Sequence, residues 1–215
     1  MSASISSPRS PQRATLVRRG LLLNYLTIAY NVLEAIVSLA AGVVAGSIAL
    51  VGFGVDSVIE VTASGAAQWR LRADLDPRRR EFVERRTVRL IGACFLALAA
   101  YVTGDSILAL WHREAPQRSV VGLAVLALSV VVMPVLARAK RRVARAIGSG
   151  TLEAEATQTA LCAYLSVIAL AGVALNALAG WWWADPAAAL AMVPIIVREG
   201  VEGVRGRTCC PDCAA

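Results

Sequence analysis

Two acidic side chains stand four residues apart inside a stretch that is otherwise mostly apolar. The stretch begins at Ser47 and reads SIALVGFGVDSVIEVTASGAA, with Asp56 and Glu60 near its middle. Four residues is about one helical turn, so both carboxylates lie on one helix face. Inside a membrane, burying both as unpaired charges costs about 5–7 kcal/mol on insertion scales. Close carboxylates also repel each other, and a divalent cation or protons relieve that repulsion. The pair therefore predicts a site for a cation or protons; the alternative is a protonated pair that hydrogen-bonds to neighbouring helices.

A second pair, Gln158 and Cys162 in QTALC, repeats the spacing of DSVIE. Asp56 lies roughly 13 Å along a helix that starts at Ser47, and Gln158 roughly 12 Å along one that starts at Gly150. Both depths are near the midplane of a bilayer core about 30 Å thick. Carboxylate and thiolate are Zn²⁺ ligands, and Zn²⁺ favours four ligands. Taken alone, Gln158 fits a helix-packing hydrogen bond and Cys162 a small buried residue. The matching depth makes all four residues candidate metal ligands.

Further acids lie within or beside apolar stretches. Glu34 follows Asn31 by three residues, so the two share a helix face. We expect them in a proton path or in contact with the metal ligands, and the alternative is a hydrogen bond between helices. Glu155 is a candidate for the inner mouth of the path, although an acid near a helix N-terminus is also favoured by the helix dipole. Asp105 and His112 fit the outer membrane interface better than an ion vestibule.

Three of the five cysteines, Cys209, Cys210 and Cys213, fall in the sequence TCCPDCAA. Thiols on the cytoplasmic side of a membrane are expected to be reduced. Clustered thiolates bind soft metals, and two such tails in a dimer would complete a tetrahedral site. The cluster is a candidate for metal capture, with a disordered tail as the alternative.

The composition indicates which elements position these residues. Of 215 residues, 57% are hydrophobic and 17% are charged, against about 45–50% and 25% in soluble domains. A transmembrane helix needs about 20 mainly apolar residues. The sequence therefore predicts an all-α membrane protein with six transmembrane helices. The sixth is the weakest, because Pro194 interrupts it. The predicted spans are 21–44, 47–68, 88–111, 120–137, 154–182 and 186–204.

The basic residues predict the orientation of these helices. All but two of the 22 lysines and arginines fall before the first span, between alternate spans, or at the end of the chain; Arg113 and Arg118 are the exceptions. By the positive-inside rule, both termini are cytoplasmic. The net charge of +7 thus reflects topology and lipid contact. Nucleic acid is not expected as a partner, because no binding motif accompanies the charge.

Three segments are expected along the chain. Residues 1–19 are rich in Ser, Pro and Arg and predict a disordered basic cytoplasmic tail. Residues 20–205 form a six-helix transmembrane transport domain, and residues 206–215 form the cysteine-containing cytoplasmic tail. No nucleophile–base pair or membrane-hydrolase motif is apparent, so the sequence does not predict an enzyme.

The chain resembles the membrane domain of the cation diffusion facilitators, the cation efflux family. GSIALVGFGVDSVIE is similar to the family's second helix, with Asp56 and Glu60 at the ligand positions. EAEATQTALCAYLSVIAL is similar to its fifth helix, which usually reads A-D-A-x-x-H-x-x-x-D, with Gln158 and Cys162 at the His and Asp positions. WWWADPAAALAM is similar to the Asp-Pro entry to the sixth helix. The likeness covers about residues 16–205. It departs from the family at Gln158 and Cys162, in having no His-rich loop between the fourth and fifth helices, and as a short form without the C-terminal cytoplasmic domain.

This resemblance implies a function. Members are six-helix proteins with both termini inside that exchange divalent metal for protons, usually as homodimers. We therefore expect proton-coupled export of a divalent transition metal, zinc or a softer ion such as cadmium, across a plasma membrane, the inner membrane of a bacterium. No permanently bound cofactor is expected. Two alternatives stay open: a non-transporting metal sensor or assembly factor that acts through the cysteine tail, and a transporter of another solute with the acids as a proton relay.

Overall fold

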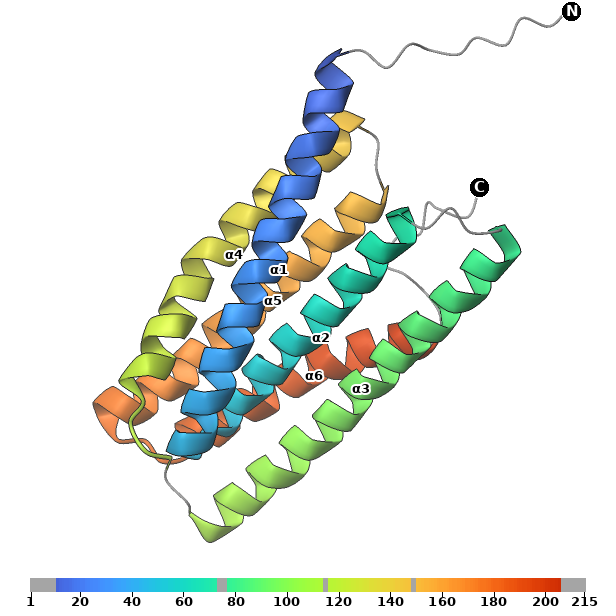
Figure 1. Cartoon of the computed structure of the whole chain (residues 1–215). Coiled ribbons are helices and arrows are strands. Elements are labelled where there is room, and N and C mark those ends of the chain that lie inside the picture. Colours follow the sequence, from blue (N-terminus) through green and yellow to red (C-terminus); the bar gives the residue numbers. More distant parts are fainter. Residues whose placement is uncertain (1–10, 73–76, 114–115, 148–149, 206–215) are drawn as a thin grey trace, which may run out of the picture.

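Six α-helices make up the described part of the chain, and no strand occurs in it (Figure 1). This computed structural model describes residues 11–72, 77–113, 116–147 and 150–205. The expected all-α architecture is confirmed. In chain order the helices are α1 (Pro11–Ala45), α2 (Ile48–Arg72), α3 (Pro77–His112), α4 (Val120–Ile147), α5 (Gly150–Ala179) and α6 (Ala184–Val204).

Each predicted apolar stretch forms a helix, because a helix satisfies its own backbone hydrogen bonds in an apolar medium. Several helices extend beyond their apolar parts. α3 begins at Pro77 and α4 continues to Ile147, so much of the arginine-rich sequence between the second and third and between the fourth and fifth predicted spans is helical. Arginine is a good helix former, which explains the extension. α1 begins at Pro11, inside the segment expected to be a tail, and α6 continues through Pro194.

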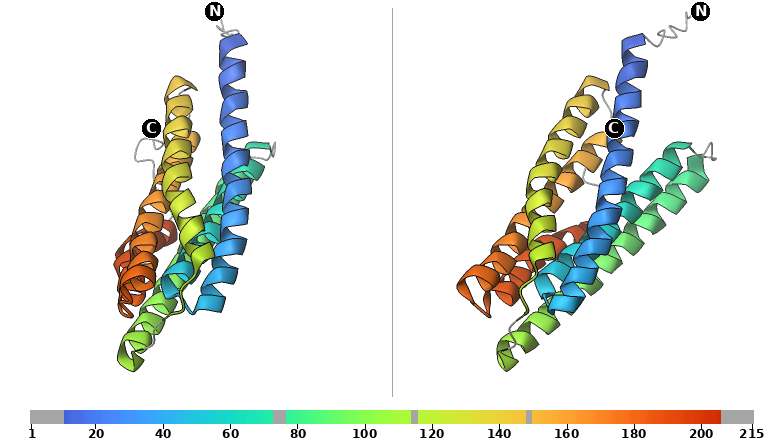
Figure 2. Two further views of the ribbon diagram at one scale, coloured as in Figure 1. Left: turned by 90° about the vertical axis from the view of Figure 1, so that its left-hand side faces the viewer. Right: turned by 60° about the vertical axis from the view of Figure 1, so that its left-hand side comes forward.

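The helices pack as three extensive pairs: α1 with α2, α3 with α6, and α4 with α5. α2 also contacts α3, α5 and α6, while α1 contacts α4 and α5 contacts α6. Successive helices run in opposite directions, as Figures 1 and 2 show. α2 therefore lies in the middle of the bundle, with neighbours on several sides of its carboxylate pair.

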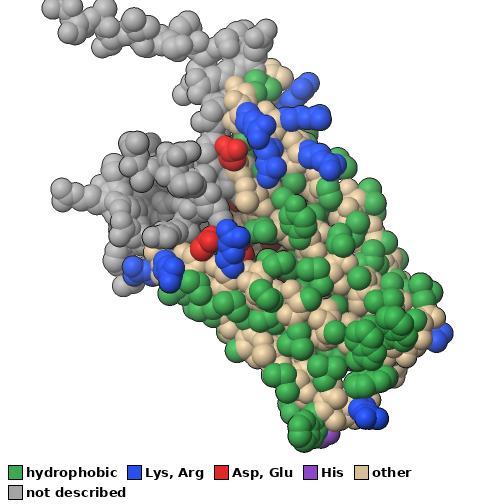
Figure 3. All heavy atoms as spheres, turned by 180° about the vertical axis from the view of Figure 1, so that it is seen from behind, with side chains coloured by type: hydrophobic (Ala, Val, Ile, Leu, Met, Phe, Trp, Pro, Cys, Tyr) green, Lys and Arg blue, Asp and Glu red, His purple; other side chains and the backbone are tan. Residues whose placement is uncertain are grey.

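Four of the six helices contain a segment that is long and apolar enough to cross a membrane: Arg18–Ala45, Arg89–His112, Val120–Ala146 and Glu155–Ala179. Over the described residues, α2 and α6 do not meet the same criterion. Both carry charged residues, Asp56 and Glu60 in α2 and Glu199 among others in α6. Figure 3 shows an apolar band of surface between a strongly basic end and an end with few charges. Four of the six predicted membrane spans are thus confirmed over the described residues, and the spans in α2 and α6 stay predictions.

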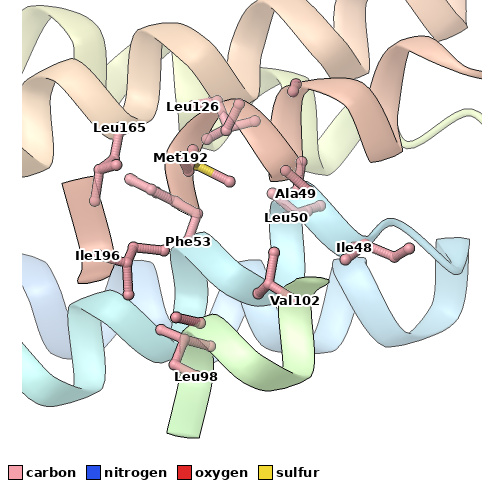
Figure 4. Close-up of a cluster of buried hydrophobic side chains, with 14 of the residues drawn as sticks. Ile48, Ala49, Leu50, Phe53, Leu98, Val102, Leu126, Leu165, Met192 and Ile196 are labelled. Carbon is pink, nitrogen blue, oxygen red and sulfur yellow. The ribbon is translucent and has the colours of Figure 1, made fainter. Parts of the chain in front are cut away.

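The apolar core is centred on α2 (Figure 4). Leu50 and Phe53 are fully buried there. They pack in a cluster with residues of four other helices, which include Leu98 and Val102 of α3, Leu126 of α4, Leu165 of α5, and Met192 and Ile196 of α6. Phe53 lies one turn before Asp56, so the core closes the bundle directly beside the carboxylate pair.

Asp185, in the first turn of α6, caps the N-terminus of α2. Its carboxylate accepts a hydrogen bond from the Ser47 hydroxyl and from the backbone N–H groups of Ile48, at 2.9 Å, and Ala49, at 3.4 Å. The first N–H groups of a helix have no partner within it, and negative charge is favoured there. Asp185 therefore fixes the start of α2 to the start of α6.

The C-terminal part of α6 approaches the middle of α3 closely at a glycine, Gly92. A Cβ atom added to Gly92 would lie 2.5 Å from the backbone nitrogen of Val204 and 2.7 Å from the carbonyl oxygen of Gly200. No real side chain tolerates such a distance, so glycine is required for this contact. Small residues allow the same close helix packing in membrane bundles generally.

Candidate cation site

All four predicted metal ligands line one small cavity among α2, α5 and α6. Asp56 and Glu60 reach it from α2, and Gln158 and Cys162 reach it from α5. The cavity has a volume of about 20 Å³, enough for one water-sized particle. Most of the remaining wall is apolar: Phe95 of α3, Leu161 and Leu165 of α5, and Ile195 and Ile196 of α6.

The polar side chains of the cavity are largely removed from solvent. Asp56 is 6% exposed, Glu60 3% and Cys162 2%, whereas Gln158 is partly buried. Burial of ionised carboxylates is costly unless a cation or hydrogen bonds compensate for the lost hydration. The cavity therefore offers a desolvated, negatively charged setting for a cation or protons.

The two oxygens of Glu60 have different surroundings. Oε1 accepts a hydrogen bond from the Thr159 hydroxyl at 3.3 Å. Oε2 is buried and has no hydrogen-bond partner among the described residues. Buried polar atoms are nearly always paired in native proteins, and an exception calls for an explanation such as an absent ion or water. The arrangement holds one oxygen in place and leaves the other for a ligand.

Glu34 and Asn31 lie on α1, and Glu34 contacts residues of both α2 and α5. Oε2 of Glu34 accepts hydrogen bonds from the Ser57 hydroxyl at 2.9 Å and from the Cys162 thiol at 3.9 Å. Asn31, one turn earlier on α1, is fully buried, and its amide has no partner within the described part of the chain. Glu34 thus contacts the candidate ligand Cys162 directly, and its place in a proton path stays a prediction.

Glu155 is paired with a lysine rather than free at the inner mouth. Its Oε2 lies 3.5 Å from the Lys140 ammonium nitrogen and accepts a hydrogen bond from Ser64 at 2.8 Å. Lys140 itself is 0% exposed. The charge pattern predicted that Lys140 lies in the connection after the fourth span, and this placement is wrong: α4 continues to Ile147, and the Lys140 side chain is buried within the bundle.

Glu199 is a cavity residue that the sequence analysis missed. It comes from α6 and lines the cavity with the four predicted residues. In the sequence it follows Arg198 within the predicted sixth span, 186–204, and it was not among the predicted site residues. Glu199 lies three residues after Ile196, so the two share one face of α6. Ile196 is buried in the core, which makes this the inward face of the helix. The spacing from an apolar residue was the available signal in the sequence.

The remaining polar candidates lie elsewhere. Asp105 and His112 line a wider pocket of about 700 Å³ beside the start of α2, together with Asp185, and Asp56 is not among its lining residues. Asp105 there accepts a hydrogen bond from the Tyr101 hydroxyl at 3.2 Å. Cys94 is an exposed free thiol. The three tail cysteines, Cys209, Cys210 and Cys213, fall outside the described residues.

The cavity brings oxygen and sulfur donor atoms together, but these atoms do not form a complete metal-binding site. Within the described ranges, no three His, Cys, Asp or Glu side chains converge closely enough to hold a metal ion. Carboxylate and thiolate donors suit Zn²⁺ and softer divalent ions. The described residues therefore supply donor atoms of the kinds that bind such ions, in positions that do not form a complete coordination shell.

The chain is similar to a known protein family over most of its length. The family described as the cation efflux transmembrane domain matches residues 25–205. This range includes all four predicted ligands, Glu34, Lys140, Glu155 and Glu199. No curated protein matches the chain.

Proposed function

The chain belongs to the cation efflux family, and from that premise we propose that it exports a divalent transition-metal cation from the cytoplasm in exchange for protons. Family membership supports metal cation transport in a membrane, rather than catalysis. Zn²⁺ is the proposed cargo, with Cd²⁺ as the softer alternative, because the donor set combines carboxylates with the thiol of Cys162. We further propose that both termini are cytoplasmic and that the protein acts as a homodimer.

The observation that carries this proposal is the shared cavity of Asp56, Glu60, Gln158 and Cys162. Its volume of about 20 Å³ admits an ion or a water molecule and excludes an organic solute. Pockets that hold drug-sized ligands measure about 300–1,000 Å³. The size therefore favours a metal ion over the alternative of a larger solute moved by a proton relay.

Proton exchange follows from the chemistry of the ligands. A carboxyl group or a thiol must lose its proton to bind a metal, so binding releases protons. The thiol of Cys162 already donates to Glu34 at 3.9 Å, which gives its proton an acceptor beside the site. Protons arriving from the other side of the membrane would occupy Asp56, Glu60 and Cys162 again and expel the metal.

Alternating access requires the cavity walls to move relative to each other. The walls come from α2 and α5 on one side and from the α3–α6 pair on the other. Rocking of helix groups about a midplane site is the general mechanism of such transporters. We propose that α3 and α6, joined closely at Gly92, move as one unit.

A flux assay tests the function. In proteoliposomes with an imposed pH gradient, the wild-type chain should move Zn²⁺, and Asp56→Ala should abolish the movement. Glu153→Ala is the matched control, because Glu153 is an exposed acid on α5 outside the cavity. Unchanged Zn²⁺ flux in Asp56→Ala would refute the proposal, and flux of a solute without metal would favour the proton relay.

A further inference from the structure

Lys140 is the only lysine in a chain that contains 21 arginines. It is also the only cation among the fully buried side chains of the described residues, where the acids Glu34, Asp56, Glu60 and Asp185 are buried. Lysine presents a compact charge and lacks the planar fork of arginine. A single buried ammonium group among several carboxylates calls for a reason.

The contacts of Lys140 lead directly toward the cation site. Its Nζ donates a hydrogen bond to the Thr159 hydroxyl oxygen at 3.2 Å and lies 3.5 Å from Glu155. The single hydroxyl proton of Thr159 has two possible acceptors: Glu60 Oε1 at 3.3 Å and the carbonyl oxygen of Glu155 at 2.9 Å. Thr159 thus connects the ammonium group to a candidate metal ligand through one atom.

The charge of Lys140 is close enough to act on the metal site. The two hydrogen bonds through Thr159 place Nζ no more than about 6.5 Å from Glu60 Oε1. At the effective dielectric constant of a protein, charges that near interact strongly enough to change a binding constant about 10- to 100-fold. The same ammonium group attracts Glu60 and repels any divalent cation that Glu60 binds.

We propose that Lys140 is an internal counter-cation of the metal site, which balances Glu60 through Thr159 and must be overcome by an arriving divalent cation. This inference rests on the proposed function. Lys140 acts as a positioning residue and not as a ligand, since its hydrogen bond goes to Thr159 and its charge acts on Glu60 and on the bound cation from a distance. Its charge lowers the affinity of the site, and a transported ion has to be bound weakly enough to leave again.

Two variants of the ion pair should change metal affinity in opposite directions. In the purified full-length chain, Lys140→Met should bind Zn²⁺ or Cd²⁺ about 10- to 100-fold more tightly, because a repelling charge is removed. Glu155→Gln should bind more weakly, because the ammonium group loses its direct partner and acts on Glu60 alone. If the pair served only to hold α4 and α5 together, both variants would change the affinity in the same direction. Isothermal titration calorimetry measures the difference.

Two controls separate charge from position. Arg141→Met removes the neighbouring positive charge on α4, for which the structure gives no contact with the site, and should leave the affinity within about twofold of wild type. Lys140→Arg keeps the charge and should stay closer to wild type than Lys140→Met. Equal or weaker metal binding by a folded Lys140→Met, or a parallel change in Glu155→Gln, would overturn the inference and leave the proposed function intact. Absence of saturable binding by the wild type would overturn both.

A measurement on the wild type guards against variants that fail to fold. Because the chain has one lysine, labelling lysine with ¹³C at Cε gives a single side-chain NMR signal. Saturating Zn²⁺ should shift this signal, Mg²⁺ at the same concentration should not, and the Zn²⁺ shift should disappear in Asp56→Asn. A lysine signal that does not move when Zn²⁺ binds would contradict the counter-cation role.

Discussion

At the scale of single residues, the cavity combines hard and soft donors on separate helices. α2 contributes the carboxylates of Asp56 and Glu60, and α5 contributes the thiol of Cys162. Carboxylates bind Mg²⁺, Mn²⁺ and Zn²⁺, whereas a thiolate prefers Zn²⁺ and softer ions. If the proposed site binds a divalent metal, we expect the thiol on α5 to determine which metal is preferred and the carboxylates on α2 to contribute most of the attraction for a divalent cation.

Replacing the soft donor tests this division. Changes outside the ligand shell alone cost about 10- to 100-fold in metal affinity, so Cys162→Ser should weaken Cd²⁺ binding at least that much. Zn²⁺ binding should fall less, because Zn²⁺ also accepts oxygen ligands. Competition titration with both metals measures the ratio. Cys94→Ser is the matched control, since Cys94 is exposed and lies outside the cavity. A proportional loss for both metals would show that Cys162 does not determine selectivity.

Residue types and spacing were enough to predict that Asp56, Glu60, Gln158 and Cys162 lie together. The members of each pair are one helical turn apart, and the two pairs lie at a similar depth along their helices. Residue types and spacing did not predict which side chains contact these four residues from the other helices. Lys140 follows Arg138 in a run of charges, and only the extension of α4 to Ile147 brings it inside. Which face of a helix points inward beyond its apolar part depends on tertiary packing, and charge counting alone does not resolve it.

At the scale of elements, α2 is held at its two ends by different means. Its N-terminus is capped by Asp185 of α6. Further along, Ser57, Glu60 and Ser64 contact α1 and α5 through side-chain hydrogen bonds. The position of the carboxylate pair thus depends on a contact nine residues before Asp56. The sequence motif Asp-Pro at the entry of α6 indicated a family likeness, but not this capping role.

Removing the cap should loosen α2 without altering any metal ligand. Asp185→Ala leaves the first N–H groups of α2 unpaired, and loss of an N-terminal cap costs about 0.5–2 kcal/mol of stability. We expect a lower midpoint of thermal unfolding in detergent, together with weaker Zn²⁺ binding. Asp185→Asn, which keeps an acceptor oxygen but loses the charge, should fall between wild type and Asp185→Ala. If Asp185→Ala unfolds at the wild-type temperature, the contact does not stabilise α2.

At the scale of the whole molecule, charge is distributed unequally between the two ends of the bundle. Twenty of the 22 basic residues were expected at one end, and Arg113 and Arg118 at the other. The burial of Lys140 removes one residue from the basic end, and the arginines that remain keep the asymmetry. Glu155 and Lys140 lie toward that end, whereas Asp105 and His112 line the pocket at the opposite end. In the orientation proposed above, the ion pair lies toward the cytoplasmic side, from which we propose that the metal enters.

The orientation itself can be measured in cells. Because positively charged segments stay in the cytoplasm, green fluorescent protein fused to the C-terminus of the full chain should fluoresce, and alkaline phosphatase at the same place should be inactive. Alkaline phosphatase fused after Gln117, between α3 and α4, should be active, since Arg113 and Arg118 are the only basic residues near it. The reverse pattern would place Lys140 and Glu155 on the outer side of the membrane and the pocket beside Asp105 on the cytoplasmic side. The proposed direction of metal movement would then be wrong.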